Sequence, residues 1–370
     1  MAYSLTRSDL QRMRLRNQRL LTRDDTAAES LVATLGAVQA QERASALLAI
    51  RARATGMTEA ALTEVLEQKR RLLRTWCLRG TLHLVASDDV HWLLPLVAPR
   101  LLKNSRRRYQ QLELDEQTLA DATELIIAAL ADRGPLTRTE LAAFLEEHNV
   151  SAEGQRMPHL LRRAALLRLL CLGPERDGEE TYVLLDKWID RPEVQVGGWE
   201  TLADRYLTAY GPASVDDFVR WSGARKGEAR KAFTAVQDTL VDVAFEGQTL
   251  WLSAAQAERL LDGSARPEPP TRLLPAYDPL LLGYHSRDWL VAPEYARRIH
   301  PGGGFLRPTL VAGGEAAGTW KLAKRNGRLE TIVTPFTTLG HKETRSLEDE
   351  VNALSGFYEM EATLSITPGE

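Results

Sequence analysis

The feature that most constrains the fold of this chain is a segment that occurs twice, 77 residues apart. Gly134-Pro-Leu-Thr-Arg-Thr-Glu-Leu141 returns as Gly211-Pro-Ala-Ser-Val-Asp-Asp-Phe218. In each copy an amphipathic segment precedes the Gly-Pro pair, and a basic segment and a short apolar stretch follow it. Self-similarity at a fixed spacing indicates an array of one supersecondary unit. The order helix, turn, capped helix, basic helix and β-hairpin is that of a winged helix, which places a helix in a DNA groove.

We predict three such repeats. In the first, which is the most degenerate, an alternating segment turns at Arg79-Gly80, as the hairpin of a winged helix does. The second has its basic third helix at 156–170, and the third has a basic helix around 225–231. The leucine-rich third helix of the second repeat would also suit a scaffold whose third helices pack together without touching DNA. The predicted repeats cover 1–112, 113–196 and 197–262.

The residues after the third repeat have a different composition. Residues 262–270 are rich in proline and typical of a linker. Beyond them apolar residues alternate in short segments, and Asn326-Gly327 predicts a tight hairpin because both residues tolerate positive φ. The fold class is therefore α+β, mainly α: three tandem winged-helix motifs followed by a C-terminal β-barrel-like domain at 263–370. Strands are expected at 273–277, 280–284, 305–311, 318–323 and 329–334, with a helix at 347–354 before a last strand.

The charge is unevenly distributed along the chain. The net charge is −3, but residues 1–112 hold 17 Arg and 2 Lys against 10 acidic residues, a net of +9. Residues 113–370 therefore hold 28 basic against 40 acidic residues, a net of −12. This asymmetry suits a surface that binds a polyanion, although locally charged helices are the alternative. The candidate phosphate contacts are Arg106, Arg107 and Arg108, followed by Arg74 and Arg79, with a solvated basic helix end as the alternative.

Composition argues against several classes of protein. No stretch approaches ~18 apolar residues, and the first twenty residues are too charged for a signal peptide. Cys77 and Cys171 both lie in apolar segments, which favours a reducing cytoplasm. The histidines and cysteines lack metal-ligand spacing, and no glycine-rich segment has phosphate-loop spacing. We expect a cytoplasmic protein with no metal and no cofactor.

The segment Leu35-Gly-Ala-Val-Gln39-Ala-Gln41-Glu-Arg43 suggests catalysis. On a helix, residues i and i+2 point roughly 200° apart, so Gln39 and Gln41 share a substrate only if the helix breaks between Ala37 and Glu42. An amide is no base near pH 7, but it can hold a water and direct a carbonyl dipole at developing positive charge. That suffices only for a weak glycosidic bond, such as that of a cationic N7-alkylguanine or N3-alkyladenine. The alternative is a polar helix end that satisfies backbone groups.

The whole chain resembles the winged-helix DNA glycosylases of the AlkZ/YcaQ type, which excise alkylated purines and unhook interstrand crosslinks. Three segments carry the resemblance: Gln39-x-Gln41, Arg74-Thr-Trp-x-x-Arg-Gly-Thr-Leu-His83 and Leu273-Leu-Pro-x-x-Asp-x-Leu-Leu-Leu-Gly283. Gln41 is similar to the antibiotic-resistance (AlkZ) branch, whereas the YcaQ branch tends to carry aspartate there. The resemblance implies that both glutamines are catalytic, that bulky adducts and crosslinks are accepted, and that the setting is resistance to a genotoxic natural product.

Two further groups of residues are site candidates. Asp278 lies in an apolar run, where a buried carboxylate must be paired or shift its pKa. It is a secondary catalytic candidate, and a turn-capping aspartate before Pro279 is the alternative. His285-Ser286-Arg287 follows on a predicted loop, and His285 and Arg287 are candidate DNA contacts unless the loop is merely polar. The glycine-rich segments 302–304 and 313–318 are expected to be turns, one of which could enter the minor groove at a lesion.

Together these observations predict a monomeric, monofunctional DNA glycosylase whose partner is double-stranded DNA containing alkylated purines or crosslinks. Water held by Gln39 and Gln41 would attack C1′ of the damaged nucleotide. The nearest lysine in the sequence is Lys69, so a Schiff-base lyase step is not expected, and the product is an abasic site. The alternative from another class is a non-enzymatic winged-helix transcriptional regulator, expected to be a symmetric dimer with exposed recognition helices.

Overall fold

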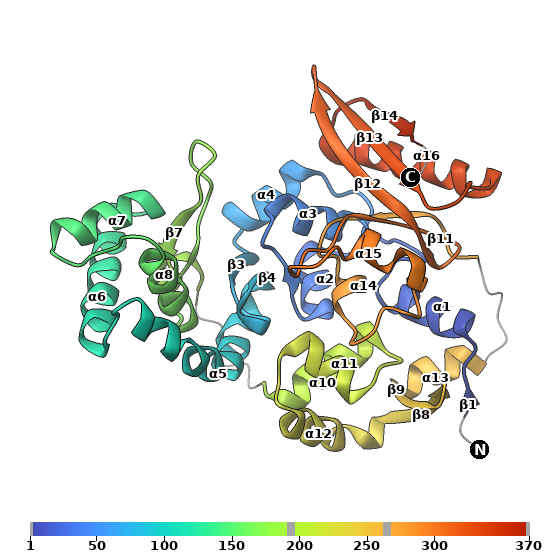
Figure 1. Ribbon diagram of the computed structural model, residues 1–370, viewed down its shortest axis with the longest axis horizontal. Helices are drawn as coiled ribbons and strands as arrows, with labels where there is room; N and C mark the ends of the chain where they lie inside the picture. The colour runs from blue at the N-terminus through green and yellow to red at the C-terminus, as the bar shows by residue number, and fades with distance from the viewer. Residues whose placement is uncertain (1–2, 191–196, 262–267, 368–370) are drawn as a thin grey trace. The chain divides into compact units, whose positions relative to one another are not determined.

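The computed structural model describes residues 3–190, 197–261 and 268–367 (Figure 1). The chain forms two compact units, which we describe separately. The larger unit consists of 1–62 and 199–370, and the smaller unit of 63–198. The division falls within helix α4 (Glu59–Glu67). The Thr58 hydroxyl accepts a hydrogen bond from the Ala61 amide and so caps the start of this helix. The predicted linker at 262–270 lies largely outside the described residues.

The N-terminal part of the larger unit holds the glutamine segment between two helices. A capping box formed by Thr6 and Asp9 begins the first helix. The first strand pairs in parallel with the hairpin of the third repeat, Tyr3 opposite Val243, a contact between distant segments that the sequence did not indicate. The elements are β1 (Tyr3–Ser4), α1 (Arg7–Asn17), α2 (Ala28–Leu35), β2 (Val38–Gln39) and α3 (Arg43–Arg51).

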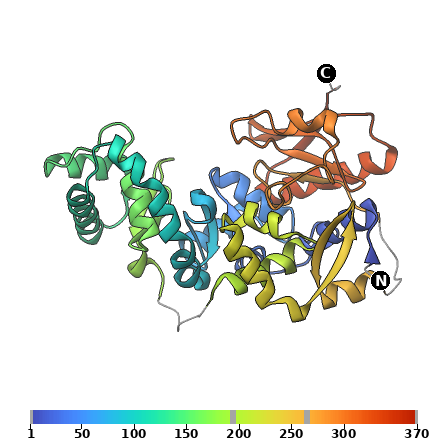
Figure 2. The same cartoon turned by 60° about the horizontal axis from the view of Figure 1, so that its bottom comes forward.

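The third repeat folds in the predicted order of three helices and a hairpin (Figures 1 and 2). Ser214 and Asp217 form the capping box of its second helix, and Gly223 ends that helix with φ 77°. An aromatic core joins the helices, because the Tyr206 ring lies 4.9 Å from Tyr210 and 5.0 Å from Trp221. The elements are α10 (Trp199–Tyr210), α11 (Val215–Ser222), α12 (Lys226–Ala235), η3 (Gln237–Thr239), β8 (Leu240–Phe245), β9 (Gln248–Ser253) and α13 (Ala254–Leu261).

The smaller unit contains the second repeat and the first hairpin. Thr137 and Glu140 form the capping box of the repeat's second helix. Its third helix ends at Leu166 rather than at the predicted residue 170, because Arg168 takes φ 63° and Leu170 begins a strand. The elements are α6 (Glu116–Arg133), β5 (Leu136–Thr137), α7 (Arg138–Glu147), α8 (Arg156–Leu166), β6 (Leu170–Leu172), β7 (Thr181–Leu184) and α9 (Leu185–Trp188).

The first hairpin turns where the sequence predicted. Arg79 takes φ 55° and Gly80 takes φ 78° in the turn. Its first strand also pairs with β6, so one antiparallel sheet runs in the order β4-β3-β6-β7-β5 through the smaller unit. A long helix follows and carries the basic residues 106–108. The elements are β3 (Leu72–Trp76), η1 (Leu78–Gly80), β4 (Leu82–Ala86), η2 (Ser87–Asp89) and α5 (Val90–Gln111).

The C-terminal domain is an open sheet, so the expected β-barrel-like closure is wrong. Its strands run in the order β10-β11-β12-β13-β14, and only the last pair is parallel. Helix α16 (His341–Tyr358) packs against β10 and β14, and a helix that covers the apolar face removes the need for the sheet to close (Figure 1). The strands are β10 (Arg272–Leu274), β11 (Thr309–Ala312), β12 (Glu315–Arg325), β13 (Arg328–Pro335) and β14 (Ala362–Ile366).

Two local predictions for this domain need correction, and one is confirmed. The expected strand at 280–284 begins as helix α14 (Pro279–Leu282), because the Asp278 carboxylate accepts from the Leu280 amide at 2.8 Å and proline suits the first helical position. Helix α16 is longer than the predicted 347–354, since the Glu343 carboxylate caps its start at Gly340. The Asn326-Gly327 turn is confirmed, with φ 50° and 74°. Short helices η4 (Pro293–Tyr295) and α15 (Ala296–Ile299) complete the domain.

A buried ion pair joins helix α3 to the C-terminal domain. Arg53 and Asp278 have no exposed side-chain surface. The two guanidinium nitrogens donate to the two carboxylate oxygens at 2.8 and 2.7 Å, the bidentate geometry that makes such pairs strong. The amide oxygen of Gln18 also accepts from Arg53, at 3.0 Å. The pair therefore ties the end of α3 to the residue that caps α14.

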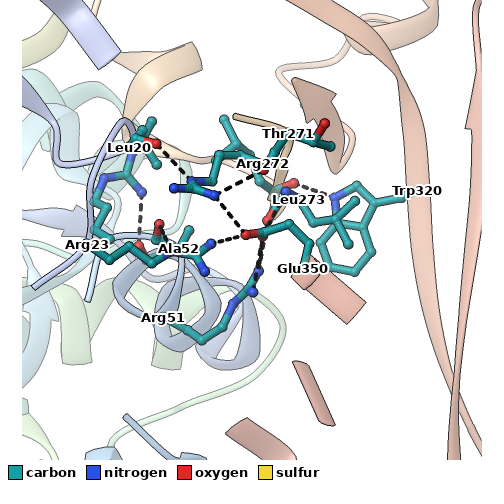
Figure 3. Close-up of polar contacts among 12 residues, drawn as sticks. Leu20, Arg23, Arg51, Ala52, Thr271, Arg272, Leu273, Trp320 and Glu350 are labelled. Carbon is teal, nitrogen blue, oxygen red and sulfur yellow. Dashed lines mark hydrogen bonds and ion pairs between the residues drawn. The ribbon is translucent and has the colours of Figure 1, made fainter. Parts of the chain in front are cut away.

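A second buried cluster surrounds Glu350 on α16. Its carboxylate accepts from Arg51 at 3.2 Å and from Arg272 at 3.1 Å, and it also pairs with Arg23 (Figure 3). The Leu273 amide of β10 donates to the same carboxylate at 3.2 Å. Burial alone would raise the pKa of Glu350, but the three guanidinium groups hold it below its usual value. One carboxylate thus links α3, α16 and the first strand of the C-terminal sheet.

We expect Asp278→Asn to destabilise the protein by about 3–5 kcal/mol, because it leaves the buried Arg53 charge without compensation. Urea unfolding of the full chain measures the change in the free energy of unfolding. Replacement of both partners by apolar residues, Arg53→Met with Asp278→Leu, should be much less damaging. The exposed Asp288→Asn is the matched control, with a change below about 0.5 kcal/mol. A value for Asp278→Asn as small as that of the control would contradict the pair's role.

His83 makes the stability of the smaller unit depend on pH. Its Nδ1 donates to the Thr81 carbonyl oxygen at 2.9 Å. Burial, with the nearby Arg79 charge, lowers the pKa of His83 from 6.5 to about 3. Below pH 6.5 the unfolded chain binds a proton that the folded chain does not bind until about pH 3, so stability falls as the pH falls through this window.

We predict that His83→Asn, which keeps a donor for Thr81 but does not titrate, weakens this dependence. Between pH 7 and pH 5 the wild type should lose about 2 kcal/mol more stability than the variant, because His83 contributes about 1.4 kcal/mol per pH unit in this range. Urea unfolding of both proteins at the two pH values measures the difference. Equal losses in the two proteins would show that His83 titrates normally in the folded state.

Candidate active site and DNA contacts

The segment with the two glutamines is not helical, which confirms the predicted helix break. Helix α2 ends at Leu35 and α3 begins at Arg43, with strand β2 between them. Burial alternates along the segment: Val38 and Ala40 are buried, Gln39 is half-buried and Gln41 is exposed. A continuous helix would place the two side chains roughly 200° apart, and the break between α2 and α3 removes that constraint.

Contacts with the third repeat fix the start of this segment. Gly36 ends α2 with φ 77°, and a Cβ at this position would lie 2.9 Å from the Trp221 ring. Only glycine tolerates both the positive φ and the close ring. The Tyr210 hydroxyl donates to the carbonyl oxygen of Leu35 at 3.2 Å, which satisfies a carbonyl at the helix end. The chain thus leaves α2 in one defined direction.

The buried ion pair is connected to this helix end by a chain of hydrogen bonds. Gln18, which accepts from Arg53, donates to the Tyr284 hydroxyl at 3.2 Å. The Tyr284 hydroxyl donates to the backbone carbonyl of Tyr210 at 2.9 Å. Because the Tyr210 side chain in turn holds Leu35, the network runs from Asp278 to the residue before Gly36. None of these partners could be found from the sequence, since they lie far apart along the chain.

Asp278, the secondary catalytic candidate, is engaged within the fold. Its carboxylate is fully buried, and each oxygen accepts from Arg53. One oxygen also caps α14 by accepting from the Leu280 amide. The turn-capping alternative describes its geometry, and the carboxylate has no surface with which to contact a nucleotide. Asp278 is therefore an ion-pairing and helix-capping residue of this fold.

An aromatic pair that the sequence analysis missed lies near the glutamine segment. Tyr277 takes φ 58°, an unusual conformation for a tyrosine. Burial raises the pKa of Tyr277, and the carboxylate of Glu42, one residue after Gln41, raises it further. The Tyr277 ring meets Phe305 edge to face at 5.7 Å, and Phe305 is 38% exposed. The preceding glycines, 302–304, all have positive φ, so the turn expected there is present.

The predicted loop 285–287 is anchored at both ends. His285 is exposed, and its backbone amide donates to the Asp217 carboxylate at 2.8 Å. Arg287 is half-buried and donates from Nε to the Leu281 carbonyl oxygen at 2.6 Å. Burial, with the charge of Arg220, lowers the pKa of Arg287. His285 borders a cavity of about 500 Å³, which is also lined by Arg14, Asp217, Trp289 and the β8–β9 hairpin.

The predicted phosphate contacts of the smaller unit differ in accessibility. Arg106 and Arg107 are exposed on α5, whereas Arg108 is half-buried and donates to Gln111 at 3.0 Å. Arg79 is half-buried in the hairpin turn. The prediction that Arg74 contacts phosphate needs correction. Arg74 is buried in β3, which lies between β4 and β6, and its guanidinium pairs with Glu180 at 2.5 Å. A guanidinium that is buried and already paired with a carboxylate is not available to DNA.

Metal-dependent chemistry and thiol nucleophiles receive no support from the residues that the structure describes. Within 3–190, 197–261 and 268–367 no group of histidine, cysteine, aspartate or glutamate side chains could hold a metal ion. Cys77 and Cys171 are unpaired thiols, and burial raises the pKa of Cys77 to about 12 and that of Cys171 further still, so neither is a ready nucleophile. In the same part of the chain, every helix is too short or too polar to cross a membrane.

Known proteins share both the sequence pattern and the fold. The family model for AlkZ-like DNA glycosylases matches residues 32–357. An interstrand DNA cross-link repair glycosylase of Streptomyces sahachiroi is 30% identical over 357 residues, which cover 91% of this chain and 92% of the relative. The solved structure of Streptomyces sahachiroi DNA glycosylase AlkZ has the same fold, with a TM-score of 0.82 and 24% identity over 98% of this chain and 100% of that chain. The chain therefore belongs to the AlkZ-like family and is a DNA glycosylase.

Proposed function

We propose that this enzyme hydrolyses the N-glycosidic bond of cationic alkylated purines, namely N7-alkylguanine and also N3-alkyladenine, and unhooks interstrand crosslinks. The observation that carries the proposal is the break between α2 and α3, which takes Gln39 and Gln41 out of a helix. Gln39 is half-buried and Gln41 is exposed, so both residues have surface that a substrate can reach. Family membership supports a catalytic role for this segment over the alternative of a polar helix end.

The chemistry follows from what two amides can do. Their carbonyl oxygens accept hydrogen bonds from a water molecule, and their dipoles stabilise positive charge as it develops on the sugar. The bond between C1′ and the base nitrogen breaks, and its electron pair neutralises the cationic purine, which leaves. The water oxygen bonds to C1′ and releases its proton to solvent, so the product is an abasic site. No general acid is needed, because the leaving base already carries the positive charge.

Crosslinks fit the same chemistry. Breaking the glycosidic bond of one tethered purine separates the two strands, and the relative from Streptomyces sahachiroi is named for interstrand cross-link repair. A site formed by a surface segment suits a bulky adduct better than a closed pocket that requires complete base flipping. We propose that exposed Phe305, supported by Tyr277, is the part of the glycine-rich turn that meets the lesion. Resistance to a DNA-alkylating natural product is the biological setting that the family resemblance implies.

We propose that the three repeats act as tandem winged helices on the DNA backbone. Support comes from their shared order of helices and hairpin, and from the exposure of Arg106, Arg107 and His285 among the predicted contacts. The proposed contacts of the smaller unit are Arg79 and 106–108, and those of the larger unit are His285 and Arg287. A non-enzymatic regulator is not favoured, because the family consists of DNA glycosylases.

The test is release of 7-methylguanine from methylated duplex DNA without heating. Wild type should release the base, and Gln39→Ala and Gln41→Ala should each lower the single-turnover rate at least ~10-fold, or about 1.4 kcal/mol of barrier. The loss is expected because each variant removes one of the two amides that hold the water. Chromatography of the released base measures the rate.

The matched control is Gln68→Ala, which removes an exposed amide outside the segment and should keep the wild-type rate. DNA affinity of all variants is measured in parallel, since a loss of binding would imitate a loss of catalysis. Absence of release from both methylated and crosslinked duplexes by wild type that binds DNA would refute the proposed substrates. Wild-type rates for both glutamine variants would refute the proposed site.

A further inference from the structure

The smaller unit contains a guanidinium group that is partly withdrawn from solvent and has no carboxylate partner among the described residues. Arg162 lies on α8, where its Nη1 donates to the buried Ser105 hydroxyl of α5 at 3.1 Å. Its Nε is buried and has no hydrogen-bond partner within the described part of the chain. The contrast on the same helix is Arg156, which pairs with Glu113 at 2.9 Å. Arg162 is thus a held cation whose charge the fold does not neutralise.

The turn of the first hairpin is shaped to receive this guanidinium. A Cβ at Gly80 would lie 2.2 Å from Arg162 Nη2, so a side chain there would displace the guanidinium from its present position. The positive φ of 78° independently favours glycine at this position. The hairpin turn, α5 and α8 therefore meet at Arg162, and Ser105 and Gly80 fix where its planar group lies.

Positively charged residues surround Arg162. Arg79 precedes Gly80 in the turn, and the exposed Arg106 and Arg107 follow Ser105 on α5. Burial, followed by the charges of Arg162 and Arg108, lowers the pKa of His159. Burial also lowers the pKa of Arg162 itself. Cations gathered in this way repel one another, and a bound anion is what removes the repulsion.

We infer that Arg162 binds one phosphate of the DNA backbone, with Gly80 and Ser105 fixing the guanidinium for that contact. The inference rests on the proposed DNA contacts and adds a residue that they do not include. A planar guanidinium suits phosphate oxygens better than a point charge does. DNA is the phosphate source, because α5 also exposes Lys103, Arg106 and Arg107, more cations than a single free phosphate ion would need.

The experiment measures binding to undamaged duplex DNA by fluorescence anisotropy over a range of salt concentrations. Arg162→Met keeps the length of the side chain but removes the charge. The slope of log Kd against log salt concentration should fall by about 0.9, the value for one phosphate contact. Arg162→Lys should keep the slope, because the charge remains, while affinity falls with the loss of the planar group. Arg156→Met is the matched control on the same helix and should keep the wild-type slope, because Glu113 already neutralises Arg156.

Arg162→Gln is a second neutral variant. It replaces Arg162→Met if that variant has a lowered Tm, so that the slope is measured on a neutral variant with the wild-type Tm. A wild-type slope in a folded neutral variant would overturn the inference and leave Arg162 a packing residue. Inorganic phosphate that raises the wild-type Tm but not the Tm of Arg162→Met, with no change in DNA slope, would also overturn it in favour of a free anion. Because no base release is measured, failure of the proposed glycosylase chemistry would leave this result unaffected.

Discussion

The ion pair between Arg53 and Asp278 is the interaction that most constrains the larger unit, because neither buried charge can be left without the other. Two ionised groups with no exposed surface are tolerable only when their hydrogen bonds are well made, and this pair is bidentate. One oxygen of Asp278 both caps α14 and accepts from Arg53. Through Gln18, Tyr284 and Tyr210, the same network reaches the carbonyl oxygen of Leu35. The direction in which the chain leaves α2 is therefore set by residues from three distant parts of the sequence.

This arrangement matters because amides are weak catalysts. In the proposed mechanism Gln39 and Gln41 cannot transfer a proton near pH 7, so position is their main contribution. A water held by two amides is useful only if both are fixed, and a segment anchored at Gly36 and followed directly by α3 provides that. The same reasoning limits the substrate: a base that already carries a positive charge needs no acid. The proposed chemistry thus needs a positioned segment, and the anchoring at Gly36 is consistent with that need.

Features governed by a few neighbouring residues could be predicted from the sequence. The break between α2 and α3, the turn at Arg79-Gly80 and the Asn326-Gly327 hairpin each depend on local backbone preferences. Features that depend on partners far apart in the chain could not be predicted from the sequence. Asp278 and Arg53 lie 225 residues apart, and nothing local shows that Glu350 collects three arginines or that Tyr3 pairs with Val243. The barrel expectation was wrong because strand pattern does not reveal which helix covers a sheet, and Arg74 was misplaced because charge does not reveal burial.

The central claim, that the amides perform the chemistry while the buried pair only supports them, is tested by one comparison. Single-turnover release of 7-methylguanine is measured for the Arg53→Met, Asp278→Leu double variant and for Gln41→Ala, both with saturating enzyme and verified folding. The account predicts that the double variant stays within about threefold of wild type, whereas Gln41→Ala falls at least ~10-fold. A folded double variant that loses release while Gln41→Ala retains it would show that Asp278 carries the reaction.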